Sequence, residues 1–205
     1  MSRLLYTVLL LLFLLQTHAQ NNCRCDEGEK LKPQIYYYAD NGKTDSAFFI
    51  YTTIKNYNTD ACQLLYYHGT SQLYLQKANW DSAWLALKQA DKLLLKAGCI
   101  PAVVSKHYSI TGLFYTRMNK LDSAAWAFLK AVEAAEKSDN KYALARAYGD
   151  VAATVSKTGD VAKSIEYDKK AIAVARTIED KTGIQLLAAK LANLSSSYQV
   201  IYKNT

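Results

Sequence analysis

Apolar and polar positions along this chain alternate with the spacing of packed helices. From Ala61 onward, apolar residues return every three or four positions, and short polar breaks divide the pattern into segments of about 16 residues. An earlier helix is expected over 44–56, and a short one over 31–38 that Pro33 interrupts. The main pattern predicts helices over 61–77, 81–97, 102–118, 122–137, 141–157, 161–178 and 184–203.

The same segments repeat with a period of about 40 residues, because short sequence elements return at that interval. Asp-Ser-Ala occurs at 45–47, 81–83 and 122–124, and Lys-Ala occurs at 130–131 and 170–171. Only three or four residues connect successive helices, which is the length that antiparallel helix hairpins use. The predicted fold is therefore all-α, an α-solenoid of stacked antiparallel helix hairpins.

The first residues have the pattern of a secretory signal. Arg3 precedes an apolar run over 4–15, and Ala19 is the small residue before the expected cleavage site. Twelve apolar residues are too few to span a bilayer comfortably. We therefore expect a signal peptide over 1–19, with export across the inner membrane to the periplasm or the outside, and no membrane span in the rest of this chain.

The remaining sequence divides into a tether, a degenerate cap and a repeat array. The polar segment 20–30 has few helix signals and is interpreted as the tether, and 31–60 as an N-terminal half-repeat or cap. The last unit stops before its second helix, although natural arrays end in a polar cap. We therefore expect the sequence to be a fragment of a longer protein. The repeats are expected at 61–100, 101–140, 141–181 and, incomplete, 182–205.

Composition narrows the possible partners. Half of the residues are hydrophobic and only two are proline, as suits a chain that forms a core. Lysine and arginine outnumber aspartate and glutamate by 25 to 18, which gives a net charge of +7. The basic residues are dispersed without a dense run, so solvated helix faces explain them better than a nucleic-acid site.

Four cysteines, at positions 23, 25, 62 and 99, suit an oxidising compartment. Their spacing does not fit a zinc site, so disulfides are expected and no metal or other cofactor is predicted. Cys62 begins one predicted helix and Cys99 follows its antiparallel mate, with an offset of one helical turn, roughly 5–6 Å. The favoured pairing is Cys62–Cys99. The competing pairing joins Cys23 or Cys25 to Cys62, and a Cys23–Cys25 bond is the most strained.

Three consecutive units resemble tetratricopeptide (TPR) repeats of the longer, roughly 40-residue variety. The resemblance covers about 61–178 and extends, in degenerate form, to the N-terminal cap. Where the family has a turn glycine, this sequence has Ala78, Asn119 and Gly159, and Val155 replaces a family tyrosine. The matching positions, which the resemblance implies pack the repeats, are Tyr67, Tyr74, Ala83, Ala90, Tyr108, Gly112, Tyr115, Ala124, Ala131, Tyr148, Ala152 and Ala171.

The sequence shows no catalytic constellation, and the only histidines after the leader, His68 and His107, lie in different units. We predict a non-enzymatic scaffold that binds a protein or peptide, and the basic residues of the groove favour an acidic partner. An alternative is the sensor region of a membrane-bound histidine kinase or a helix-turn-helix regulator. By family geometry, first helices line a concave groove at Leu65, His68, Gln72, Lys106, Ser109, Leu113, Arg117, Arg146 and Lys157.

Overall fold

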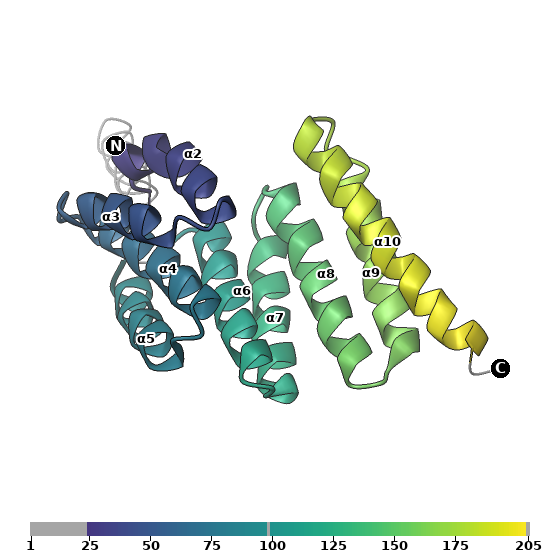
Figure 1. Cartoon of the computed structure of the whole chain (residues 1–205). Helices are drawn as coiled ribbons and strands as arrows, with labels where there is room; N and C mark the ends of the chain where they lie inside the picture. The colour runs from purple at the N-terminus through teal and green to yellow at the C-terminus, as the bar shows by residue number, and fades with distance from the viewer. Residues whose placement is uncertain (1–23, 98, 204–205) are drawn as a thin grey trace, which may run out of the picture. The chain divides into compact units, whose positions relative to one another are not determined.

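The computed structural model describes residues 24–97 and 99–203, and these form helices and turns without a β-strand (Figure 1). The predicted all-α class is confirmed. The signal peptide expected over 1–19 and the cysteine at position 23 lie outside the described residues. The chain separates into two compact units, Met1–Ile100 and Pro101–Thr205.

The first unit is built from two helix hairpins. α2 packs on α3 and also touches α4, while α4 packs on both α3 and α5. Its core contains Ile35 of α2, Ile54 of α3 and Leu65 of α4, all buried. The helices are α2 (Asp26–Asp40), α3 (Thr44–Lys55), α4 (Asp60–Gln76) and α5 (Trp80–Ala97), coloured purple to teal in Figure 1.

The second unit continues the same construction. α6 pairs with α7 and α8 pairs with α9, and α8 also packs on α6 and α7. α10 lies against α8 and α9. The hairpin core centres on Phe128 of α7 and Val151 of α8. The helices are α6 (Pro101–Arg117), α7 (Leu121–Glu136), α8 (Lys141–Lys157), α9 (Val161–Ala175) and α10 (Lys181–Lys203), coloured from teal through green to yellow in Figure 1.

The N-terminal segment differs from the prediction. The segment interpreted as a tether is helical from Asp26, and α2 continues through Pro33 to Asp40. Acidic residues in the first turn favour the helix N-terminus, and the loss of one backbone hydrogen bond at Pro33 is offset by packing. Ile35, 1% exposed, supplies that packing. Tertiary contacts therefore stabilise a helix that local sequence signals disfavour.

Three hairpin turns each contain one residue with a positive φ angle. Ala78, Asn119 and Gly159 occupy equivalent turns and have φ angles of 55°, 56° and 91°. Only glycine adopts this left-handed region without a Cβ penalty, so the two other residues carry strain for the same geometry. The starts of the second helices vary more. The Asp160 side chain caps α9, and the Asn79 side chain accepts a hydrogen bond from the Ser82 amide at the start of α5.

The small residues that the resemblance singled out lie where helices touch. The five alanines of the second helices are each 0% exposed to solvent. Gly112 of α6 lies against Phe128 of α7, where a Cβ would come within 2.6 Å of the ring. Aromatic rings fill the adjacent spaces, as in the Tyr108–Trp126 pair, with centroids 5.9 Å apart, and the Tyr148–Tyr167 pair at 6.2 Å. Small residues thus let the helices approach, and rings fill the gaps.

Candidate functional site

The predicted groove residues are divided between the two units and between surface and core. Leu65, His68 and Gln72 belong to α4, and the other six belong to α6 and α8. Leu65, His68 and Ser109 are buried, so they are not part of an open surface. Gln72, Lys106 and Leu113 are half-buried, and the exposed members are Arg117, Arg146 and Lys157. The partner-binding role of these residues stays a prediction.

Leu65, one of the buried members, packs in a hydrophobic core. Leu65 belongs to the core of the first unit, and a Cβ at Gly28 of α2 would collide with it. Among the exposed members, the Nε of Arg146 lies 3.8 Å from the Oδ2 of Asp150 one turn along α8. The three exposed cations all lie on first helices of the second unit, α6 and α8. The exposed cations among the predicted groove residues are therefore confined to the second unit.

A charged cluster that the sequence did not reveal joins α10 to the α8–α9 hairpin. Lys190 of α10 is 8% exposed, and the end of its side chain lies against Gly149, where a Cβ would require that side chain to shift. Asp168 of α9 is 1% exposed, and its Oδ1 has no hydrogen-bond partner in the part of the chain that the structure describes. Burial raises the pKa of Asp168 and of Asp150, and the nearby Lys190 ammonium partly opposes both shifts.

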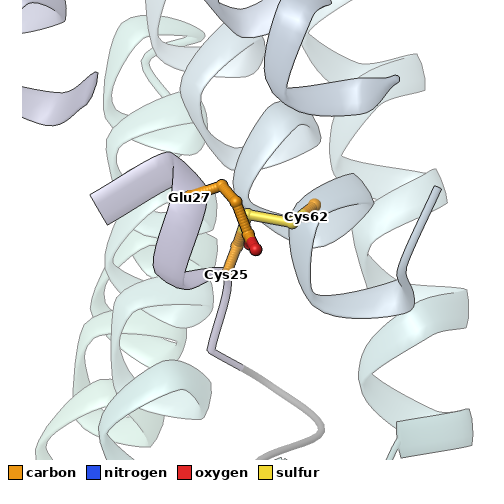
Figure 2. Close-up of side chains that lie close together, drawn as sticks. All are labelled: Cys25, Glu27 and Cys62. Carbon is orange, nitrogen blue, oxygen red and sulfur yellow. A yellow bond between two sulfur atoms is a disulfide. The ribbon is translucent and has the colours of Figure 1, made fainter. Parts of the chain in front are cut away.

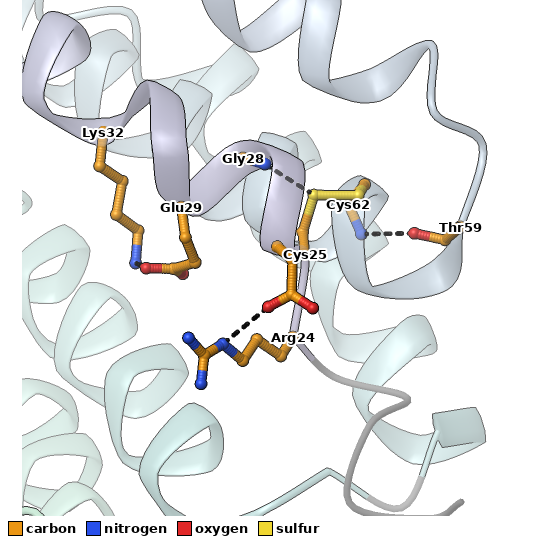
Figure 3. Close-up of a disulfide and its surroundings, with 8 residues drawn as sticks. Arg24, Cys25, Gly28, Glu29, Lys32, Thr59 and Cys62 are labelled. Carbon is orange, nitrogen blue, oxygen red and sulfur yellow. Dashed lines mark hydrogen bonds and ion pairs between the residues drawn. A yellow bond between two sulfur atoms is a disulfide. The ribbon is translucent and has the colours of Figure 1, made fainter.

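A second site, at the N-termini of α2 and α4, contains a disulfide between Cys25 and Cys62 (Figure 3). Their Cα atoms lie 4.7 Å apart, across a sequence separation of 37. The Sγ of Cys25 accepts a hydrogen bond from the Gly28 amide at 3.3 Å and caps α2. The Thr59 hydroxyl accepts one from the Cys62 amide at 3.1 Å and caps α4. The bond therefore joins two capped helix ends.

This pairing corrects the favoured Cys62–Cys99 prediction. The competing pairing with Cys25 holds because α2 packs against α4 and brings the two helix starts together. Cys99 is also disulfide-bonded, and none of the described cysteines is a free thiol. Helix spacing within the α4–α5 hairpin does not decide the pairing, because α2, from outside that hairpin, contacts α4 and carries the Cys25 partner.

The carboxylate of Glu27 lies beside the two sulfurs, as Figure 2 shows. One ligand atom from each of these three residues lies within 4.8 Å of the others, a spacing that would suit a metal ion. The two sulfur atoms are bonded to each other, however, and a disulfide offers no thiolate to a metal. The disulfide at this cluster therefore links the start of α2 to the start of α4 covalently.

Within residues 24–97 and 99–203, no helix combines the length and the apolar character needed to cross a bilayer.

Comparison with known proteins establishes the fold. No family model matches the sequence, and no curated protein matches it either. The crystal structure of BtubC (BKLC) from P. vanneervenii superposes with a TM-score of 0.70 at 15% identity, covering 83% of this chain and 71% of that one. A Podosopora anserina putative kinesin light chain with nearly identical TPR-like repeats gives 0.63 at 16%, covering 87% and 90%. The chain thus has the fold of TPR-like helical repeats.

Proposed function

We propose that this chain is an exported, non-enzymatic scaffold that binds a protein or peptide partner. The observation that supports this function is the TPR-like hairpin array itself, in which first helices carry charged side chains on exposed positions. Stacked helix pairs offer an extended surface on which many side chains can meet one partner. The function follows from this surface and not from a reacting group.

The charge of the second unit favours an acidic partner. Arg146 and Lys157 are exposed on α8, and Arg117 is exposed at the end of α6. The chain as a whole carries a net charge of +7. Complementary charge speeds association and disfavours basic partners, and its effect weakens with added salt. We infer that a peptide with several carboxylates binds along α8.

Two double variants, each replacing two basic residues by neutral glutamine, test this function. Partners are captured with the full, disulfide-bonded chain from the extracellular and envelope fractions of the source cell and identified by mass spectrometry. The capture is repeated with Arg146→Gln/Lys157→Gln on α8. The matched control is Lys163→Gln/Lys169→Gln, which removes the same charge from exposed positions on α9.

The proposal expects the α8 pair to lose the main acidic partner and the α9 pair to keep it. Equal losses in both pairs would mean that overall charge alone drives the capture. The absence of any specific partner for the parent chain would overturn the scaffold function.

A further inference from the structure

A hollow on the first unit has the chemistry of a peptide site. It lies between α4 and α5 and has a volume of about 390 Å³, which falls within the range of ligand pockets in proteins. All of its lining residues come from these two helices, so one hairpin builds it. They are Tyr66, Tyr67, Thr70, Tyr74, Ser82, Leu85, Ala86 and Gln89.

None of the lining residues carries a charge, and three of them are tyrosines. The described residues provide no hydrogen bond to the hydroxyl of Tyr66, Tyr67 or Tyr74. The three tyrosines line the same hollow. Burial, and after it the neighbouring Tyr74 and Tyr67, raises the pKa of Tyr66. The rings are half-buried, and none of the three hydroxyls is among the buried polar atoms that lack a partner, so each is open to solvent and accessible to a ligand. The hollow therefore presents several unused donors beside apolar rings.

The surrounding residues hold two of the rings in place. The Phe48 ring of α3 packs on Tyr74, with centroids 4.9 Å apart. The Lys55 ammonium lies 5.0 Å from the centre of the Tyr66 ring. Leu85 of α5, 60% exposed, adds an apolar side chain that no neighbour covers fully. Rings fixed in this way can bind without losing much conformational freedom.

We propose that this hollow binds an uncharged, proline-rich peptide segment in the polyproline II conformation. Such a segment has free backbone carbonyls and few N–H groups, so it needs donors such as tyrosine hydroxyls and the Gln89 amide. Its proline rings pack on aromatic side chains, as in other aromatic-lined grooves. The proposal rests on the scaffold function and names a partner class for the first unit.

The spacing of the tyrosines agrees with this occupant. Tyr67 and Tyr74 lie seven residues apart on α4, which corresponds to roughly 10 Å along the helix axis. Three residues of polyproline II span about 9 Å. Two prolines separated by two other residues would thus each reach one of these tyrosines. A basic segment is disfavoured, because the lining offers no negative charge and the Lys55 ammonium lies beside the Tyr66 ring.

Titration of the full, disulfide-bonded chain tests the proposal. The probe is an acetylated and amidated peptide of repeated Pro-Pro-Ala units, and binding is followed by NMR chemical shifts of the protein. A peptide of the same length with alanine in place of every proline serves as the first control, and cellohexaose serves as a neutral carbohydrate probe, because sugars also stack on tyrosines and accept their hydrogen bonds.

The test variant is Tyr67→Phe/Tyr74→Phe, which keeps both rings and removes two hydroxyls. The matched control is Tyr36→Phe/Tyr37→Phe on the exposed face of α2. Loss of two hydrogen bonds should raise the Kd for the proline peptide about tenfold or more in the test variant, and leave it unchanged in the control. That result, with shifts confined to α4 and α5, supports the proposal.

Three outcomes would overturn it: no binding of the proline peptide at millimolar concentration, equal binding by the alanine peptide, or tighter binding of cellohexaose. These results leave the scaffold function intact if the α8 charge variant still loses its captured partner. The scaffold function fails separately, when the parent chain captures nothing.

Discussion

Gly112 provides the sharpest test of how the hairpins pack. A Cβ at this position would lie 2.6, 2.7 and 2.8 Å from three carbons of the Phe128 ring, whereas carbon atoms in contact normally lie about 3.5–4.0 Å apart. Phe128 is 5% exposed and belongs to the core of the second unit, so its ring has little room to move. Gly112→Ala therefore forces α6 and α7 apart or displaces the ring.

The change in the free energy of unfolding caused by Gly112→Ala combines two opposed effects. Overpacking of this kind costs about 1–3 kcal/mol, whereas replacing glycine by alanine inside a helix gains about 0.5–1 kcal/mol. Gly112→Ala should therefore lose about 0–2.5 kcal/mol of the free energy of unfolding. Gly112→Leu adds a larger side chain against the same ring and should lose at least about 1–3 kcal/mol. Ala153→Gly, at an exposed position of α8, measures the propensity effect alone.

The assay is urea denaturation with the disulfides intact, followed by circular dichroism. Phe128→Leu in the Gly112→Ala background should restore part of the loss, and the double-mutant cycle should give a coupling of about 1 kcal/mol. If Gly112→Leu stays within 0.5 kcal/mol of the parent, or if the Gly112→Ala and Phe128→Leu changes are simply additive, the packing described for this hairpin is wrong.

Three further changes test other features. Ala78→Gly should raise the free energy of unfolding by about 1 kcal/mol, because the φ of 55° no longer strains a Cβ; an unchanged or lower melting temperature would contradict this. Burial raises the pKa of Asp168, so ionising this carboxyl destabilises the fold. The free energy of unfolding of the parent should therefore fall, relative to that of Asp168→Asn, as the pH rises above about 4. Parallel pH profiles of the two proteins would refute this. Cys25→Ser/Cys62→Ser should cost about 4 kcal/mol by chain entropy, whereas peptide mapping that joins Cys62 to Cys99 would exclude the described bond.

The proposed site was only partly visible in the sequence. The tyrosines at positions 67 and 74 were recognised as repeat-packing residues, but nothing in their spacing showed that they line a hollow with residues of α5. Leu65 and His68 were expected in a groove and are buried. Helical periodicity tells which residues share a face, but it does not tell which other element covers that face.

The sequence by itself determined the helices and their pairing into hairpins. A 3.6-residue pattern and short polar connections are local properties, so helices such as α8, predicted and found over 141–157, follow from neighbouring residues alone. The repeated alanines likewise fixed where helices approach closely, since only small side chains permit that distance.

Tertiary structure decided what depends on segments far apart in the chain. The bond between Cys25 and Cys62 exists because α2 folds onto α4, and α2 continues through Pro33 because that packing outweighs a local cost. Lys190 is buried because α10 lies on α8 and α9, where Gly149 leaves room for its side chain. Burial and pairing are set by distances between helices, and a one-dimensional pattern carries no record of those distances.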